Sequence, residues 1–230
     1  MCGRFVGYRN KEELLDLFPI DECRTEVTGS YNIAPSQEIL AIVRQDNKNY
    51  LEKFHWGLVP SWAKDISMGA RMINARAETV HSKPSFRSAF KQRRCLILSD
   101  GFYEWSGDAG SKQPYFLTII GEKPFAFAGL WERWDDKGKR FPEYRSCAII
   151  TTTASDSMRH IHHRMPVILK PEVYQQWLDT EFQDTPGLRE ILNSMTITEL
   201  VSHPVSRQVN TVRNNEPSNI KPLEQLKLKL

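Results

Sequence analysis

The sequence lacks any apolar run long enough to cross a membrane. Near the middle of the chain, the longest run free of charge and strong polarity is residues 124–131, far short of the roughly 20 residues that a spanning helix needs. The opening residues, Met1 to Phe5, contain no apolar segment typical of a secretory signal. We therefore expect a cytoplasmic protein with no membrane association.

Cysteine is scarce, and glycine-rich phosphate loops are missing. The 230 residues contain four cysteines, none of them in a C-x-x-C pair, which argues against a zinc ribbon and against a dense disulfide framework. No G-x-G-x-x-G or Walker loop is present, and strands and helices show no regular βαβ alternation, so a doubly wound nucleotide-binding fold is disfavoured. The composition, 40% hydrophobic and 26% charged, is that of a soluble globular protein.

Short apolar runs bounded by turn residues predict a fold rich in strands. They cover residues 38–43, 50–55, 95–99, 115–120, 125–130, 147–153 and 167–169. Helices are predicted at 11–18, capped by Asn10, and at 84–93 and 171–178, which both open with proline. We expect a single α+β domain over residues 1–213, with a curved, mostly antiparallel β-sheet core and interspersed helices, followed by a polar, loosely held C-terminal tail at 214–230.

Positive charge is concentrated in one segment. The whole chain carries 31 basic and 28 acidic residues, so 31 − 28 = +3. Residues 64–94 contain eight basic residues and two acidic ones, which gives 8 − 2 = +6. This clustering indicates either a phosphate-binding path or a solvated helix face. Beside it, Trp56 and Trp62 flank a Gly/Pro loop, and either could be a stacking platform for unstacked bases or a core residue.

Cys2 is the most informative residue, because removal of Met1 would make it the N-terminus. Such a cysteine carries an α-amine of pKa ~8 and a thiol of pKa ~8.5 on adjacent carbons. The thiol can attack an amide with the amine as base, as in N-terminal-nucleophile hydrolases. Alternatively, the amine condenses with an aldehyde to an imine, and the thiol closes a five-membered thiazolidine. The plain alternative is a cysteine that merely follows Met1.

Other motifs contain groups that such a nucleophile needs. Asn74 and Arg76 place an amide and a guanidinium two residues apart, although a turn cap and a surface charge are the simpler interpretations. Glu104 lies among aromatic residues, and burial there would raise its pKa as a general acid requires, whereas an exposed strand carboxylate would not. Residues 160–166 contain three histidines but no nearby further metal-ligand motif, which favours an acid–base histidine over a metal site.

Taken together, these motifs resemble the SOS response-associated peptidase (SRAP) family. The resemblance runs from residues 1–5 to 203–206 and includes residues 31–35, 56–57, 74–79, 101–105 and 162–166. It implies the SRAP fold and a protein that senses and shields abasic sites in single-stranded DNA during repair and the SOS response. The position after the family histidine is often Asp and is His163 here. We assign His162 as the acid–base residue, with His163 as the alternative.

The resemblance also implies a covalent mechanism. The amine of Cys2 attacks C1′ of the ring-opened abasic deoxyribose, and the thiol then closes a thiazolidine crosslink that prevents strand breakage, which is lyase-type imine chemistry. The implied catalytic residues are Cys2, Asn74, Glu104 and His162, and the implied DNA-binding residues are Arg4, Asn32, Trp62, Arg76, Arg87 and Arg164. Asn74 would hold the sugar or the amine, and His162 or Glu104 would protonate the ring oxygen. Self-removal of Met1 would account for the peptidase label.

This chemistry requires no cofactor and no metal. The expected partner is single-stranded DNA that contains an abasic site, with junctions between single and double strands left open, and we expect a monomer that lies at the nucleoid in a prokaryote. One alternative is a class II glutamine amidotransferase, which also begins Met-Cys-Gly but usually carries an Asn-Gly pair that this sequence lacks. Another is a non-enzymatic DNA-binding reader, which has no use for Cys2.

Overall fold

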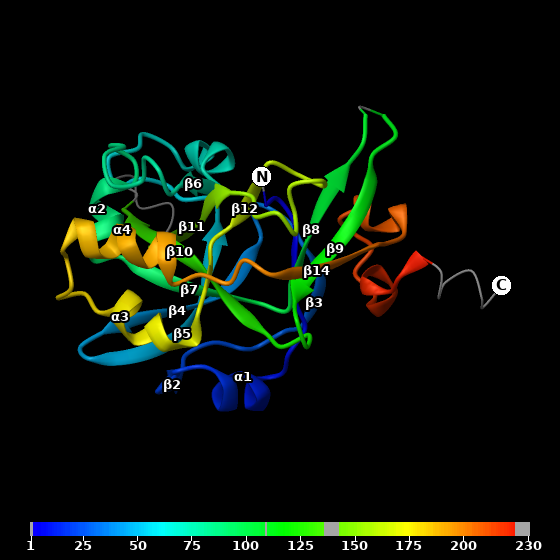
Figure 1. Cartoon of the computed structure of the whole chain (residues 1–230). Coiled ribbons are helices and arrows are strands. Elements are labelled where there is room, and N and C mark those ends of the chain that lie inside the picture. Colours follow the sequence, from blue (N-terminus) through cyan, green and yellow to red (C-terminus); the bar gives the residue numbers. More distant parts are fainter. Residues whose placement is uncertain (1, 109, 136–142, 224–230) are drawn as a thin grey trace.

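The computed structural model describes residues 2–108, 110–135 and 143–223, which form two β-sheets with short helices around them (Figure 1). The smaller sheet is antiparallel and has the strand order β14-β9-β8-β1-β3. Its strands are β1 (Phe5–Gly7), β3 (Ser30–Ile33), β8 (Gly101–Ser106), β9 (Gln113–Ile119) and β14 (Leu200–Pro204).

The larger sheet curves until it closes on itself. Its order is β12-β11-β10-β7-β4-β5-β2, and β5 also pairs with β11, so that five strands form a ring. The strands are β2 (Glu22–Cys23), β4 (Glu38–Gln45), β5 (Lys48–Trp56), β7 (Arg94–Ser99), β10 (Phe125–Trp134), β11 (Tyr144–Thr153) and β12 (Arg164–Pro166). Two short strands join it: β13 (Ile168–Leu169) pairs with β10, and β6 (Asn74–Arg76) pairs in parallel with β11.

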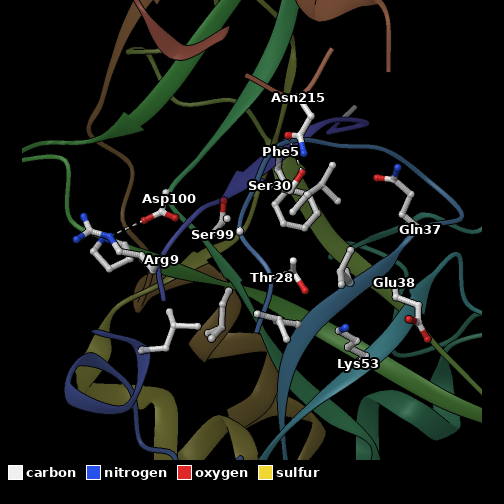
Figure 2. A pocket seen from close by; sticks show the side chains of 18 residues that line it. Phe5, Arg9, Thr28, Ser30, Gln37, Glu38, Lys53, Ser99, Asp100 and Asn215 are labelled. Carbon is white, nitrogen blue, oxygen red and sulfur yellow. Dashed lines mark hydrogen bonds and ion pairs between the residues drawn. The ribbon is translucent and has the colours of Figure 1, made fainter. Parts of the chain in front are cut away.

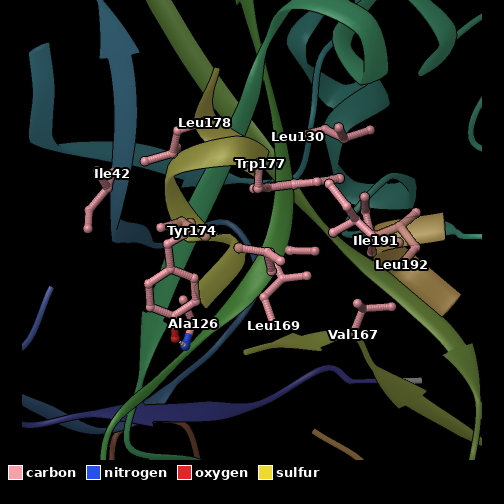
Figure 3. Packing of buried hydrophobic residues seen from close by; sticks show 14 of the residues in the cluster. Ile42, Ala126, Leu130, Val167, Leu169, Tyr174, Trp177, Leu178, Ile191 and Leu192 are labelled. Atoms are coloured by element: carbon pink, nitrogen blue, oxygen red, sulfur yellow. Dashed lines mark hydrogen bonds between the residues drawn. The ribbon is translucent and has the colours of Figure 1, made fainter. Parts of the chain in front are cut away.

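Both faces of the larger sheet are buried, and side chains alternate between two cores. In β7, Leu96 belongs to the cluster on the helix side, whereas Cys95 and Ile97 belong to the cluster shared with the smaller sheet. Figure 3 shows the helix-side cluster, in which Trp177 and Ile191 pack near the strands. The helices are α1 (Lys11–Leu17), α2 (Arg87–Gln92), α3 (Tyr174–Leu178) and α4 (Thr185–Ser194), with 3-10 turns η1 (Ile66–Arg71), η2 (Pro171–Val173), η3 (Arg207–Asn210) and η4 (Pro217–Ile220).

The expected fold class is confirmed, and all seven predicted strands are present. The cap at Asn10 is also confirmed: its side chain accepts from the Glu13 N–H at 2.9 Å, and the Glu13 carboxylate accepts from the Asn10 N–H at 3.0 Å. The helix expected at 84–93 begins only at Arg87, and a 3-10 turn precedes α3. No helix among the described residues is long and apolar enough to cross a membrane.

The expectation of a loosely held tail is wrong for residues 214–223. The Asn215 side chain accepts from the Tyr31 N–H at 2.6 Å, which ties this segment to β3. Asn219 is fully buried and donates to the carbonyl of Asn214 at 2.7 Å. The amides of Asn215 and Asn219 satisfy backbone groups of the fold, while residues 215–217 and 221 are exposed. Residues 224–230 lie outside the described part of the chain.

Two of the eight basic residues at 64–94 serve the fold. Arg93 pairs with the buried carboxylate of Glu132 at 2.9 Å. Arg94 of β7 is buried, and its guanidinium donates to backbone carbonyls in or just after α2 and α3. These hydrogen bonds connect both helices with β7. The acceptors are the carbonyls of Phe90, Lys91, Trp177, Asp179 and Phe182. The six other basic residues are exposed, as are the two acidic ones, so the exposed charge is 6 − 2 = +4.

Replacing Arg94 with methionine should destabilise the protein by about 3–5 kcal/mol, because several buried carbonyls would lose their donor at once. Urea unfolding measures this difference in the free energy of unfolding. Lys91→Met changes an exposed cation in the neighbouring helix and should stay within about 0.5 kcal/mol of the parent. Equal stability of the two variants would contradict the structural role of Arg94.

Candidate functional site

Cys2 precedes β1 and is completely buried in the core shared by the two sheets. β1 pairs with β8 through Phe5 and Phe102, and the Tyr103 N–H donates to the carbonyl of Arg4 at 2.9 Å. This pairing brings Cys2 to the strand that carries Glu104. Burial, and secondly the charge of Glu104, raise the pKa of the Cys2 thiol, so the thiol is neutral at pH 7.

Glu104 is the buried carboxyl group of β8, with 4% of its surface exposed. Burial raises the pKa of its side chain, and nearby positive charge, including that of Lys112 on the β8–β9 side, opposes this shift. A carboxyl group with a raised pKa retains its proton at higher pH than an exposed glutamate. A pKa raised in this way suits a group that acts as a general acid.

Asn74 opens β6 and holds the backbone of Cys2. β6 lies beside Ile149 of β11 in a parallel pairing, and from there the Asn74 Nδ2 donates to the carbonyl oxygen of Cys2 at 2.9 Å. The Asn74 Oδ1 is buried and has no hydrogen-bond partner among the described residues. Because buried acceptors are nearly always satisfied, this oxygen is placed to receive a donor that arrives with a ligand or on the amine of residue 2.

His162 lies between β11 and β12 with its ring orientation fixed. His162 Nδ1 lies 3.0 Å from the backbone nitrogen of Arg164 and 3.1 Å from its carbonyl oxygen. When Nδ1 accepts from the Arg164 N–H, the neutral ring carries its hydrogen on Nε2. Burial is the main cause that lowers the pKa of His162, which keeps the ring neutral at pH 7. His163 is exposed and stacks on His162 with ring centroids 4.5 Å apart. This geometry favours His162 over His163 as the acid–base residue.

Two further contacts connect the histidine segment to its surroundings. The Ser106 hydroxyl at the end of β8 donates to the His160 carbonyl at 3.4 Å. Arg164 forms a two-point ion pair with Glu78, with Nη2 to Oε2 at 3.0 Å, and also donates to the Thr151 carbonyl at 2.6 Å. The ion pair joins the segment after β6 to β12, so the parts of the chain that carry Asn74 and His162 are fastened together.

The structure thus brings the four predicted catalytic residues to one region, from four separate segments. The Asn74–Cys2 hydrogen bond and the Glu104–Cys2 electrostatic interaction join β6 and β8 to Cys2. His162 lies just before β12, which pairs with β11 as β6 does, and the labels of β6, β8 and β12 lie near that of the N-terminus in Figure 1. Sequence reasoning missed Lys112, whose charge acts on both Glu104 and His162. No sequence signal identifies it, because its position depends on the β8–β9 hairpin.

Three of the six predicted DNA-binding residues are exposed. Trp62 is 56% exposed in the loop after β5. Arg76 and Arg87 are exposed, and their side chains form no hydrogen bond or ion pair with the described part of the chain. These three side chains are available to a partner. Trp56, the other tryptophan of the loop, is buried and donates to the Ile73 carbonyl at 2.9 Å.

The other three are engaged within the protein. Asn32 is 1% exposed, accepts from Arg4 at 2.7 Å, and donates to the carbonyls of Val209, Thr211 and Asn214. Direct contact between Asn32 and DNA is therefore a wrong expectation for this structure, because its amide is fully used inside the core. Arg4 also donates to the Val209 carbonyl at 2.8 Å, and Arg164 is held by Glu78.

A separate cavity of about 410 Å³ lies beside β1 and away from these groups (Figure 2). Phe5 forms part of its lining, and the ion pair between Arg9 and Asp100, at 2.9 Å, stands at its edge. None of the four predicted catalytic residues lines it. The described residues contain no group of three side chains suited to hold a metal ion.

Comparison with protein families matches residues 1–212 to the family described as SOS response associated peptidase (SRAP). The abasic site processing protein YoqW of Bacillus subtilis is 42% identical over 223 residues, which cover 96% of this chain and 99% of the relative. YedK of Escherichia coli, which has the same description, is 30% identical and covers 97% of this chain and 100% of its own length. The chicken protein HMCES is 36% identical over 79% of this chain and 61% of its own length.

Solved structures show the same fold. A phage-related protein from Bordetella bronchiseptica has a TM-score of 0.70 at 30% identity and covers 90% of this chain and 95% of its own. A protein from Bacteroides thetaiotaomicron has a TM-score of 0.75 at 24% identity, and covers 94% of this chain and 92% of its own. The arrangement of the two sheets is therefore shared with experimentally determined proteins.

Glu104→Gln should change how stability depends on pH. Because the pKa of Glu104 is raised in the folded state, the native protein binds more protons than the unfolded chain between the ordinary glutamate value and the raised one. The free energy of unfolding of the parent therefore falls as pH rises through that window. Glutamine cannot ionise, so the variant should lose this fall and be at least as stable as the parent at pH 8.

Urea unfolding from pH 4 to pH 8 measures the effect, and Glu199→Gln, a change at an exposed carboxylate, is the matched control. The control should retain the pH dependence of the parent. A Glu104→Gln profile parallel to the parent profile would show that Glu104 is not a carboxyl group with a raised pKa.

Proposed function

Because the chain belongs to the SOS response-associated peptidase (SRAP) family, we propose that it processes abasic sites in DNA and shields them in single strands. The shield is a thiazolidine crosslink formed by Cys2 after removal of Met1. The observation that carries this proposal is a second-position cysteine buried beside the carboxyl group of Glu104, with its carbonyl held by Asn74. Relatives described as abasic site processing proteins support it along nearly the whole chain.

The first step forms a carbon–nitrogen bond. The neutral α-amine of Cys2 adds to the aldehyde carbon C1′ of the ring-opened sugar, and the resulting carbinolamine loses water to give an imine. The departing hydroxyl needs a proton, which the carboxyl group of Glu104 supplies; burial favours its protonated form because it raises the pKa. The unpartnered Oδ1 of Asn74 accepts from the amine or from a sugar hydroxyl, which fixes the direction of attack.

The second step closes the ring. The thiol sulfur adds to the imine carbon, the carbon–nitrogen double bond becomes single, and the thiol proton ends on nitrogen, with Glu104 as the carrier. The net reaction joins aldehyde and aminothiol and releases one water. Since burial keeps the thiol neutral, the amine attacks first. An imine left open would favour β-elimination, so ring closure protects the strand.

His162 acts earlier, on the closed form of the sugar. Its Nε2–H, which remains when Nδ1 accepts from Arg164, donates to the ring oxygen as the hemiacetal opens. We extend the proposal to removal of Met1 by the same site, in keeping with the peptidase description of the family. The protein acts as a monomer in the cytoplasm and needs no cofactor.

The DNA path uses the exposed members of the basic segment. Arg76 and Arg87 contact phosphates, and Trp62 offers a face on which a displaced base stacks. Arg4 and Arg164 are restrained by Asn32 and Glu78. They approach the phosphates beside the abasic nucleotide only if those restraints loosen.

A denaturing gel tests the crosslink directly. Mature protein incubated with single-stranded DNA that carries one abasic site should give a heat-stable adduct, and Cys2→Ala should give none. Glu104→Gln should slow adduct formation by about 10²–10⁴-fold, the usual contribution of a general acid–base group. Mass spectrometry of the same samples establishes that Met1 is absent.

Controls separate the competing activities. Protein whose Met1 is retained should crosslink only in proportion to the processed fraction, because its Cys2 nitrogen is an amide. An absent adduct from fully processed protein would contradict the proposal, and glutamine hydrolysis would identify an amidotransferase. Binding that survives Cys2→Ala with no adduct from the parent would identify a non-enzymatic reader.

Glu78→Gln should strengthen binding to single-stranded DNA. The change removes a negative charge near the path together with its ion pair to the Arg164 guanidinium, which keeps its hydrogen bonds to Thr151, so one more uncompensated cation faces the phosphates. We expect a Kd about threefold to tenfold lower at low salt, and a steeper dependence on salt. Glu199→Gln alters the net charge equally at an exposed position elsewhere and should leave Kd nearly unchanged. Equal gains in affinity in both variants would show that the effect comes from net charge alone.

A further inference from the structure

An open hollow of about 370 Å³ beside α2 has no role in the chemistry at Cys2. It is lined by His81, Arg87, Ser88 and Lys91. Each of these side chains can donate a hydrogen bond, two carry permanent positive charge, and no acidic residue lines the hollow. Such a lining suits an anion with several acceptor oxygens.

The positive charge of the hollow is not neutralised within the described part of the chain. Arg87 and Lys91 stand four residues apart on α2, a spacing at which like charges repel. Both are exposed, and neither forms an ion pair with any described residue. The neighbouring Arg93, in contrast, pairs with Glu132 at 2.9 Å. The fold therefore neutralises one arginine and leaves the two adjacent cations facing the hollow.

The two uncharged members of the lining also have donors to spare. Ser88 Oγ accepts from Arg93 Nη2 at 2.9 Å, so its own hydrogen can be given to another acceptor. His81 Nδ1 is buried and has no hydrogen-bond partner among the described residues. With its hydrogen on Nε2, the His81 ring presents a donor to the hollow that it lines.

We propose that this hollow binds an internal phosphodiester of the DNA strand that flanks the abasic nucleotide. The inference rests on the proposed function and extends its DNA path. The planar fork of Arg87 and the point charge of Lys91 take the two non-bridging oxygens, and Ser88 and His81 add hydrogen bonds. The lining contains no acceptor directed at base edges, so the contact is independent of sequence.

The backbone leads from the Cys2 site to this hollow. Two hydrogen-bonded turns follow β6: the Val80 N–H donates to the Arg76 carbonyl at 2.9 Å, and the Arg87 N–H donates to the Lys83 carbonyl at 2.9 Å. Exposed Arg76 ends β6 at the near end of this route, and exposed Arg87 opens α2 at the far end; both elements are labelled in Figure 1. A strand that leaves the abasic nucleotide over Arg76 continues onto the hollow.

The test uses oligonucleotides with an unreactive tetrahydrofuran abasic analogue, lengthened one nucleotide at a time on the 5′ or the 3′ side. Lys91→Glu places a carboxylate four residues from Arg87, where the new ion pair removes the charge of the hollow. We expect the Kd of this variant to rise about tenfold, and its salt slope to fall by about 0.7 for each lost phosphate contact. Both effects should appear only when the oligonucleotide exceeds a threshold length on one side. Lys91→Arg should bind like the parent.

Lys123→Glu is the matched control, because it makes the same charge change at an exposed position away from the basic segment. The loss of affinity in this control should be small and should not depend on oligonucleotide length. Identical length profiles for Lys91→Glu and Lys123→Glu would overturn the proposal. So would a threshold that appears only when the oligonucleotide ends in a phosphate, since the hollow would then hold a strand end.

Failure of this inference is distinguishable from failure of the proposed function. Adduct formation by the parent protein on a reactive abasic oligonucleotide shorter than the threshold tests Cys2 chemistry alone. If the adduct forms and the Lys91→Glu profile matches its control, only the hollow is excluded. If the adduct does not form, the proposed function fails whatever the binding profiles show.

Discussion

The pairing of β1 with β8 is the constraint on which the site depends. It places Cys2 in the core between the two sheets, with Gly3 and Arg4 half-buried after it, and fixes Cys2 beside Glu104, with the Tyr103 N–H on the carbonyl of Arg4. The same core packs Phe5 against Trp56 and Phe127. Burial is the main cause that raises the pKa of both the Cys2 thiol and the Glu104 carboxyl group.

Such a site is held together at a cost in stability. The buried carboxyl group of Glu104 weakens the fold. So does the buried Oδ1 of Asn74, which has no hydrogen-bond partner among the described residues. Stability alone would favour apolar replacements. The surrounding structure offsets this with two closed cores on either face of the larger sheet. The ion pair between Arg164 and Glu78 adds a clamp between the segments of Asn74 and His162. In the proposed mechanism the amine must attack first, because the thiol adds to the imine carbon that this attack creates.

The sequence predicts a structural element correctly where neighbouring residues cause that element to form. The capping box at Asn10 and the longer strands follow from neighbouring residues, and they are correct. β6 and β12 are three residues each and are extended only because β11 lies between them, which no local pattern indicates. Charge counting likewise cannot distinguish exposed Arg87 from Arg94, whose guanidinium lies among carbonyls. The motifs identified candidate residues for the site, but the contacts of Asn32, Lys112 and Glu78 required the fold.

Under the proposed function, the exposed arginines affect how the protein distinguishes an abasic site from intact DNA. Exposed cations such as Arg76 and Arg87 attract any strand, since phosphates carry no sequence and are unchanged by loss of a base. They supply affinity but no discrimination. Selectivity must then arise at Cys2, where only a sugar that opens to an aldehyde gives the amine a carbon to attack. A missing base also leaves room for the sugar to approach the buried carboxyl group, whereas an intact nucleotide would have to bring its base into the same core. Under the proposed function, recognition therefore rests on covalent chemistry at Cys2 and on electrostatic attraction at the exposed cations.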